Sequence, residues 1–363
     1  MVVKKQPKAK LSKAQLIAAE VNKQLGAGTL RMGNDQAFAT RRLVSGLLPV
    51  DHMLDGGFPR NRTTELYGDY STLKSFIGLC AIAAAQARGE VCALIDTEHS
   101  FDEPWAIQLG VNTDDLILEQ PESGEAAVDI TESLIRQDVD LIIWDSVAAT
   151  LPQAERRKRL KDETVQMARL AALMSLAMRK LTAANANTAL VFINQTRMNV
   201  GIVFGNPETT PGGKALPFYA SYRMSLRKAG KVTQSVKSWD GEKFVTTKRT
   251  LGQKIKLTME KSKLSAPFTE TWFTFDLKAG KIDEAGYLMT LGVEKNLIMS
   301  KGATWTSKTA GITARGAGAF RGKLEADLTA QNKLRAALNL PGIAVPAKRK
   351  VSSPKKRSLV KRG

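Results

Sequence analysis

Residues from about 62 to 195 alternate short apolar runs with longer helical stretches. The runs typical of buried strands are 64–67, 91–95, 141–144 and 189–193. The helical stretches between them are 76–88, 124–136 and 167–184. Because parallel strands need a crossover between them, this alternation predicts an α/β fold, with a mostly parallel twisted sheet and helices on both of its faces.

Three further apolar runs, 222–227, 254–259 and 271–275, follow one another more closely. Short spacing of this kind favours antiparallel pairing, so we expect these strands to extend the sheet at one side. Asp240 and Gly241 form a dipeptide that is typical of a hairpin turn. The tip of a hairpin is therefore expected there.

The N-terminal segment cannot fold alone. Ser12 and Gln15 have the spacing of a capping box and predict the start of a short amphipathic helix. One helix with few apolar positions buries too little surface, so it must pack on its own core or on a neighbouring copy. We predict four parts, which are an N-terminal segment over 1–36, a core over 37–277, a small α+β C-terminal domain over 278–340 and a disordered basic tail over 341–363.

The charge of the chain favours a polyanionic partner. The sequence has 54 Lys and Arg against 35 Asp and Glu, a formal net charge of +19. Nucleic acid is the first candidate, and the alternative is a generally basic, well-solvated surface. No stretch approaches the roughly 20 apolar residues of a membrane helix. We therefore expect no membrane partner and a cytoplasmic, nucleoid-associated location.

Cysteine and histidine are too scarce for a disulfide framework or a zinc site. Cys80 and Cys92 are the only cysteines, and each lies in an apolar run that predicts a buried free thiol. His52 and His99 are the only histidines. Any metal should therefore be an oxygen-liganded ion such as magnesium.

A candidate phosphate-binding loop follows the first expected strand and opens the first expected helix. Its residues are Gly68, Asp69, Tyr70, Ser71, Thr72, Leu73, Lys74 and Ser75. Backbone amides would cradle the phosphates, Lys74 would reach the β- and γ-phosphates, and the Ser75 hydroxyl would hold magnesium. Taken alone, the pattern also fits an ordinary strand-to-helix turn.

Leu73 departs from the usual pattern, which has a second glycine at this position. If the backbone there needs a positive φ, leucine costs about 1–2 kcal/mol. If the backbone is near-helical, the cost is small. The sequence leaves both options open.

Two acidic residues stand at the ends of other expected strands. Asp145 follows the run 141–144 and would lie on the magnesium side, although an aspartate at a strand end is also a common turn former. Glu98 follows the run 91–95 and could activate a water, although it could equally be a solvated surface residue. A lysine and two carboxylates at one sheet edge are hard to explain by packing needs, so the combination indicates an ATPase.

Two loops are candidates for nucleic-acid contact. Residues 196–213 are rich in Gly, Pro, Asn and Thr and predict a long irregular loop. In it, Arg197 could neutralise phosphate, and Val200 and Phe204 could insert beside bases. The other loop, over 155–166, begins with a strongly basic run that could alternatively be a solvated charged surface.

These elements, in this order, resemble the bacterial RecA recombinases. The resemblance is most specific over 192–221 and extends to 26–33, 174–180, 260–268 and 291–297. It covers nearly the whole chain and weakens in the hairpin and the tail. The family implies an ATP-dependent DNA recombinase, acting in recombination and repair, that forms helical filaments on single-stranded DNA, pairs it with homologous double-stranded DNA and uses ATP and Mg²⁺.

The resemblance implies roles for individual residues of the ATP site. Lys74 and Ser75 match the lysine and hydroxyl of the family's phosphate loop, Asp145 its magnesium-side aspartate and Glu98 its water-activating glutamate. Asp102 and Trp105 match the positions that contact adenine, with Trp105 in place of a tyrosine. Gln195 matches the glutamine that senses the γ-phosphate and begins the second DNA loop.

Contacts between subunits and with DNA follow from the same resemblance. Lys261 and Lys263 match a pair that reaches the ATP of the neighbouring subunit, Phe218 matches an aromatic that plugs into that subunit, and the N-terminal segment matches the polymerisation element. The residues expected to contact DNA are Arg156, Arg157, Lys158, Arg159, Arg179, Arg197, Met198, Asn199, Val200, Gly201, Phe204, Gly212, Gly213 and Lys214.

Several positions depart from the family. Besides Leu73, Pro217 replaces a basic interface residue, Lys214 replaces a neutral polar one, and the tail is basic where bacterial members often have an acidic one. These changes fit a divergent member of the family. One option is a virus-encoded member that acts in the host cytoplasm. Two alternatives stay open: a hydrolysis-impaired filament that only coats single strands, and a ring-forming helicase motor, which leaves the N-terminal segment unexplained.

Overall fold

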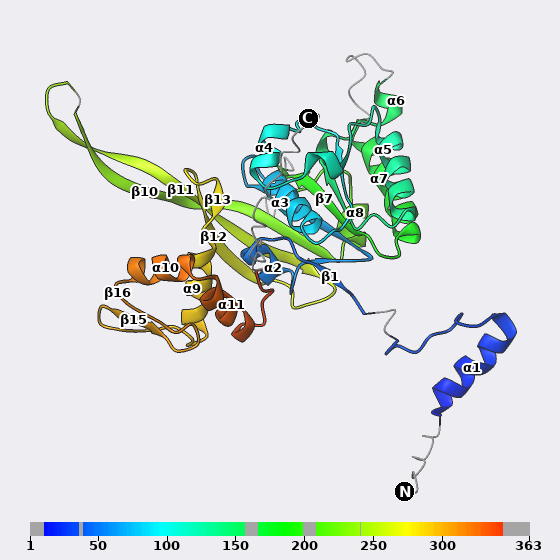
Figure 1. The fold of residues 1–363 in the computed structure, drawn as a ribbon. Coiled ribbons are helices and arrows are strands. Elements are labelled where there is room, and N and C mark those ends of the chain that lie inside the picture. The colour runs from blue at the N-terminus through cyan, green and yellow to red at the C-terminus, as the bar shows by residue number, and fades with distance from the viewer. Residues whose placement is uncertain (1–10, 36–38, 157–165, 199–207, 240, 344–363) are drawn as a thin grey trace, which may run out of the picture. The chain divides into compact units, whose positions relative to one another are not determined.

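The computed structural model describes residues 11–35, 39–156, 166–198, 208–239 and 241–343 (Figure 1). The chain divides into two compact units, over residues 1–41 and 42–363. The first unit contains helix α1, Lys13–Leu25, which begins with the predicted capping box of Ser12 and Gln15. Its apolar Leu16 and Ile17 are exposed.

A nine-stranded sheet forms the centre of the second unit, as far as the structure describes it (Figure 1). The strand order is β13-β12-β11-β10-β3-β7-β6-β4-β5. The mutually parallel strands are β10 Tyr222–Trp239, β3 Arg62–Gly68, β7 Ala189–Gln195, β6 Leu141–Asp145, β4 Cys92–Asp96 and β5 Leu116–Glu119. The antiparallel extension consists of β11 Phe244–Ser262, β12 Glu270–Asp276 and β13 Lys281–Ile282. The predicted fold class is confirmed.

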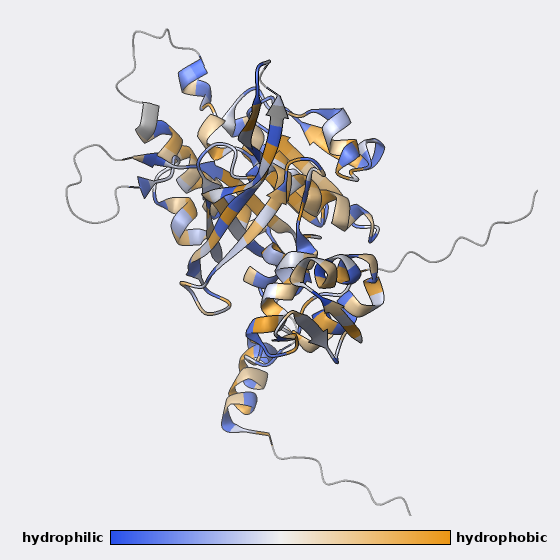
Figure 2. Cartoon of the chain, turned by 90° about the vertical axis from the view of Figure 1, so that its left-hand side faces the viewer, coloured by the Kyte–Doolittle hydropathy of each residue, from blue (hydrophilic) through white to orange (hydrophobic). Residues whose placement is uncertain are grey.

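Helices cover both faces of the parallel strands. Helix α3, Lys74–Gln86, packs with Ile143 and Ile193 on one face. Helices α5, Gly124–Arg136, and α7, Gln166–Ala184, pack with Trp144 and Phe192 on the other. Neighbouring residues of one strand thus face different helices, which explains why β4, β6 and β7 are apolar over most of their length. Figure 2 shows the resulting concentration of hydrophobic residues in the sheet and its covering helices.

Strands β10 and β11 form a hairpin much longer than predicted. Their pairing continues from Tyr222 opposite Ser262 to Trp239 opposite Phe244. The hairpin therefore turns between Trp239 and Phe244, the region of the predicted tip, of which Asp240 lies outside the described residues. The apolar runs at 222–227 and 254–259 mark only the part of the hairpin within the sheet.

The C-terminal part is a small α+β domain, as predicted. It contains β14 Met299–Lys301, β15 Thr304–Ser307, β16 Ile312–Arg315, α9 Glu284–Glu294, α10 Ala317–Ala326 and α11 Leu328–Ala337. The Glu284 carboxylate accepts a 2.8 Å bond from the Leu48 amide and pairs with Arg335 at 2.8 Å, which ties α9 to the core and to α11. Pro341 and Ile343, placed in the tail by the sequence, hydrogen-bond to α11.

Short elements complete the described fold. They are β1 Arg42–Leu43, α2 Leu48–Met53, β2 Phe58–Pro59, α4 Glu103–Gln108, α6 Gln153–Arg156, β8 Arg197–Met198, β9 Glu208–Thr209 and α8 Ala215–Tyr219. Cys92 is buried and Cys80 half-buried, and both thiols are free. None of the helices in the described ranges is long and apolar enough to span a membrane.

Candidate active site and nucleic-acid interface

The predicted phosphate loop connects β3 to α3. Gly68, the last residue of β3, has a φ of 156°, and a Cβ there would lie 2.2 Å from the Leu226 carbonyl oxygen, so only glycine fits beside β10. The Lys74 ammonium donates to the carbonyls of Gly68 at 2.9 Å and Asp69 at 2.7 Å. The loop therefore curls around the lysine that is expected to meet phosphate.

Leu73 adopts the left-handed conformation, with φ 72° and ψ 22°, immediately before the first residue of α3. Of the two options that the sequence left open, the structure has the strained one, which costs about 1–2 kcal/mol for a residue with a Cβ. The Leu73 side chain is half-buried and packs against the hydrophobic core. Its packing offsets part of the backbone strain.

The structure brings Lys74, Ser75 and Asp145 together at the carboxyl edge of the sheet. Burial raises the pKa of Asp145 to about 6, a hydrogen bond from Ser75 opposes this shift, and the nearby Glu98 and Asp96 add to it. Burial also lowers the pKa of Lys74, against the attraction of Asp145 and Glu98. The groups are close enough to interact electrostatically in a poorly solvated site.

Glu98 lies between two neighbouring strand ends. Its Oε1 accepts hydrogen bonds from the Ser146 hydroxyl at 2.5 Å and from the Gln195 side-chain amide at 3.0 Å. Ser146 follows β6 and Gln195 ends β7, two residues before β8. The residue expected to activate water thus contacts the residue expected to sense the γ-phosphate.

Asp102 and Trp105 lie beside the same edge. A cavity of about 100 Å³ is lined by Ser75, Asp145, Asp102 and Trp105, among others. Asp102 caps α4 by accepting a 2.8 Å bond from the Trp105 amide. The two predicted adenine contacts and the two predicted magnesium ligands therefore face one cavity.

Asp96 is a member of this site that the sequence analysis missed. It is 2% exposed, and its Oδ2 accepts bonds from the Ser100 and Phe101 amides and the Gln120 side chain. Its buried Oδ1 has no hydrogen-bond partner, and the residue lines the cavity. Its position at the end of β4, two residues before Glu98, was the available signal.

The donor set fits magnesium bound together with a nucleotide. Ser75 and Asp145 supply oxygen ligands, and magnesium commonly takes one or two protein ligands and completes its shell with phosphates and water. The described residues contain no group of three or more His, Cys, Asp or Glu side chains that could hold a metal alone.

Lys261 and Lys263 are not brought to the phosphate loop of their own chain. The Lys261 ammonium donates to the carbonyls of Pro217 at 2.7 Å and Phe218 at 2.8 Å. Lys263 donates to Phe218 at 3.0 Å and Tyr219 at 3.3 Å. Both therefore cap the end of α8, whose Phe218 side chain is 69% exposed. They lie near the first residues of β3, at the sheet end opposite Gly68.

The expectation of an irregular loop over 196–213 is wrong at both ends of the segment. Strands β8 and β9 pair antiparallel. Beyond β9, Asn194 donates to the Pro211 carbonyl at 3.0 Å, and to the buried Glu65 carboxylate at 3.0 Å. The returning chain is therefore anchored on the sheet.

Gly212 and Gly213 have a packing role in addition to any contact with DNA. Their φ values are 90° and 73°. A Cβ would lie 2.9 Å from the Val147 side chain at Gly212 and 2.7 Å from that of Ala171 at Gly213. Glycine is needed at both positions because the chain passes closely over Val147 and α7.

The other predicted DNA contacts are mostly exposed or lie outside the described residues. Arg156 forms an ion pair with Glu122. Arg179, Arg197, Met198 and Lys214 are exposed. Those outside the described residues are Arg157, Lys158, Arg159, Asn199, Val200, Gly201 and Phe204.

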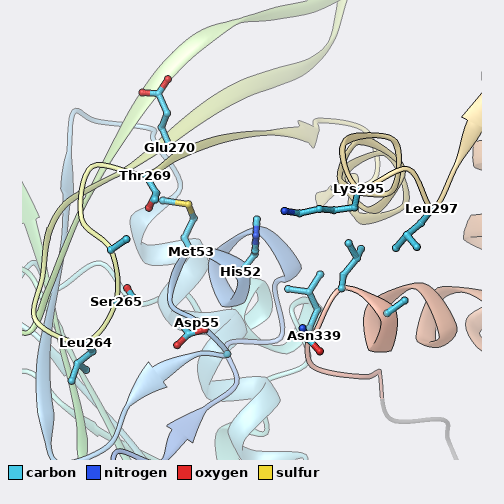
Figure 3. A pocket seen from close by; sticks show the side chains of 15 residues that line it. His52, Met53, Asp55, Leu264, Ser265, Thr269, Glu270, Lys295, Leu297 and Asn339 are labelled. Carbon is cyan, nitrogen blue, oxygen red and sulfur yellow. The ribbon is translucent and has the colours of Figure 1, made fainter.

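A larger hollow lies away from this edge. Its volume is about 920 Å³, and its lining includes His52, Lys295 and Leu264 but none of the residues predicted for ATP or DNA. Figure 3 shows Lys295 extending toward His52. Burial lowers the pKa of His52, the negative charge of Glu294 opposes this shift, and the positive charge of Lys295 adds to it. Size alone therefore does not identify the functional site of this protein.

The parallel sheet, the loop between β3 and α3 and the carboxylates at the same edge define the class of α/β proteins with a phosphate-binding loop. A family model described as RecA N-terminal domain matches residues 12–281. The chain is similar to Protein RecA of Chlorobaculum parvum, with 39% identity over 90% of this chain and 91% of that protein. It is also similar to Protein RecA of Chlorobaculum tepidum, with 40% identity over 90% and 92%, and of Ectopseudomonas oleovorans, with 41% over 83% of each. The chain belongs to the RecA family, which confirms the resemblance.

Proposed function

We propose that the protein is a DNA-dependent ATPase that assembles as a filament on single-stranded DNA and promotes homologous pairing and strand exchange. The observation that carries this proposal is the hydrogen bond between Gln195 and Glu98. It links the strand end that leads into the β8–β9 segment to the carboxylate beside Lys74. A change at the nucleotide would therefore reach the predicted DNA loop through one side chain.

Each group in the site has a role in the proposed reaction. Lys74 would hold the β- and γ-phosphates, Ser75 and Asp145 would hold magnesium, and Glu98 would accept a proton from the attacking water. Magnesium supplies charge neutralisation for the transferred phosphoryl group when it is bound. Trp105 would stack on adenine.

The arrangement also supports ATP sites shared between subunits. Lys261 and Lys263 lie at the sheet end opposite the phosphate loop, and Phe218 beside them is exposed. The two lysines would leave the carbonyls of α8 and reach the ATP of a neighbouring subunit, with Phe218 and the N-terminal segment as further contacts. Hydrolysis would then require a filament. We keep the four predicted parts, 1–36, 37–277, 278–340 and 341–363, as the division of labour, except that residues 341–343 go with the C-terminal domain because Pro341 and Ile343 bond to α11. The proposed place of action is the cytoplasm.

The variant Glu98→Gln tests this function. Glutamine keeps the size of the side chain but is a far weaker base, so DNA-stimulated ATP hydrolysis should fall about 100-fold or more while ATP binding and filament assembly remain. Glu119→Gln, at the end of β5 on the same sheet edge, is the matched control and should hydrolyse ATP normally. Phosphate release is measured with and without single-stranded DNA.

If Glu98→Gln hydrolyses ATP at the normal rate, Glu98 does not accept the proton of the attacking water. If the wild-type protein forms filaments but shows no DNA-stimulated hydrolysis, it is the alternative, a filament protein that only coats single strands. Rings in place of helical filaments would indicate the ring-forming helicase motor.

A further inference from the structure

The β10–β11 hairpin projects from the edge that holds the candidate site. Because β10 runs parallel to β3 and Leu226 pairs with Gly68, the residues after Leu226 continue past the carboxyl end of β3. Residues 227–239 span about 40 Å at the usual rise of a strand. Figure 1 shows the two strands extending far from the helices of the core as a free ribbon.

The root of the hairpin contacts both halves of the candidate site. Arg227 forms an ion pair with Glu208 of β9, which borders the predicted DNA loop. The Lys228 ammonium lies 4.0 Å from the centre of the Tyr70 ring in the phosphate loop. The ribbon is thus fixed at the place where we expect nucleotide and DNA to bind.

The outer hairpin is basic on a face that also presents aromatic rings. Residues 231–250 contain five basic and two acidic residues, and both acids lie in the turn. Directly paired residues of two antiparallel strands lie on one face. Trp239 pairs with Phe244, Lys237 with Thr246 and Lys248 with Ser235, and since these positions alternate along each strand, all six residues share a face.

The aromatic pair at the tip of the hairpin is largely exposed. Trp239 and Phe244 stack edge to face with centroids 5.2 Å apart, which helps to hold the turn. Trp239 is nevertheless 59% and Phe244 72% exposed. Besides holding the turn, the two rings are therefore accessible to a partner, next to the exposed Lys237 and Lys248.

We propose that the outer β10–β11 hairpin is a binding arm for double-stranded DNA. In this arm the rings of Trp239 and Phe244 would press against sugar or base edges, and Lys237 and Lys248 would contact phosphates. The proposal rests on the proposed function, because it assigns the arm to the incoming duplex and leaves the single strand to the β8–β9 segment.

Charge and shape favour a DNA duplex over a protein partner. Alternating Lys, Ser and Thr side chains on a ribbon offer few apolar contacts beyond the tip, whereas the cores of protein interfaces are depleted of charge. A two-stranded ribbon fits the major groove, which is about 12 Å wide. In that groove, apolar rings can contact base edges while the flanking cations contact phosphates.

Duplex binding by two pairs of full-length variants tests the arm. Trp239→Val together with Phe244→Val keeps a β-forming pair at the tip and removes both rings. Affinity for a labelled duplex of arbitrary sequence, followed by fluorescence anisotropy, should fall about fivefold or more. Single-strand-stimulated ATP hydrolysis, measured on the same samples, should be unchanged.

The second pair of variants tests whether duplex binding depends on one face of the hairpin or only on its overall positive charge. Lys248→Ala and Arg249→Ala remove the same charge at adjacent exposed positions, but Arg249 pairs with Gln234 on the opposite face. Lys248→Ala should weaken duplex binding and reduce the slope of its salt dependence by about 1, and Arg249→Ala should have the smaller effect.

Three results would overturn the arm. The first is unchanged duplex binding by the valine variant, and the second is an equal loss of duplex affinity in Lys248→Ala and Arg249→Ala. The third is an effect of the valine variant on filament length alone, which would make a neighbouring copy the partner. A wild-type protein without DNA-stimulated hydrolysis would count against the proposed function but not against the arm, since duplex binding is measured directly.

Discussion

The left-handed conformation of Leu73 predicts which of two variants at this position is the more stable. Leu73→Ala and Leu73→Gly both lose the half-buried side chain, so the difference between them isolates the backbone. Alanine at a φ of 72° costs about 1–2 kcal/mol. Glycine avoids that cost but loses about 0.5–1 kcal/mol through the greater freedom of its unfolded chain. The glycine variant should therefore be the more stable by about 0.5–1 kcal/mol.

Urea unfolding of the two variants without nucleotide measures this difference. Ala83→Gly, inside α3, is the control, because there glycine should be less stable than alanine by about 1 kcal/mol. Opposite signs at positions 73 and 83 are expected. If Leu73→Ala proves as stable as Leu73→Gly, position 73 is not left-handed in solution and the loop is not strained.

Two further predictions concern charge. Burial raises the pKa of Asp51 to about 7 from 3.8, so the folded protein retains a proton that the unfolded chain releases, and stability should fall as the pH rises from about 4 to 7. The variant Asp51→Asn keeps an acceptor for the Ser45 amide and should abolish this decline in the midpoints of urea unfolding. An unchanged decline in the variant would contradict the prediction. Removal of residues 344–363, which carry eight basic and no acidic residues, should weaken duplex binding and flatten its salt dependence; identical titrations of both proteins at two salt concentrations would refute a role for the tail. The cut follows Ile343 because that residue bonds to Asn332.

Much of the fold could be predicted because local signals agreed with tertiary packing. The capping box of Ser12 and Gln15 marks the start of α1, and α5 has the predicted bounds of Gly124 and Arg136. Strands β4, β6 and β7 were found because both of their faces are covered, which makes most of their positions apolar. Lys74, Glu98 and Asp145 could be brought together from the sequence because parallel strands share one carboxyl edge.

The remaining features depend on contacts that sequence spacing does not encode. The outer hairpin was missed because its residues are exposed on both faces and show no apolar alternation, although Val232, Val236 and several threonines favour strands. The φ of Leu73 depends on how the loop curls around Lys74. The bonds of Lys261 and Lys263 depend on where α8 ends, and the partnerless oxygen of Asp96 depends on burial within the cavity.

The position of Lys261 and Lys263 gives the proposed filament a chemical direction. Each ATP would be completed by lysines from one side only, so a head-to-tail row has an unequal pair of ends. The terminal subunit at one end would hold nucleotide that its own Lys74 contacts but no neighbour's Lys261 or Lys263 approaches, and the terminal subunit at the other end would keep Lys261 and Lys263 on its own α8 carbonyls. A row of any length would therefore contain one fewer complete catalytic site than it has subunits.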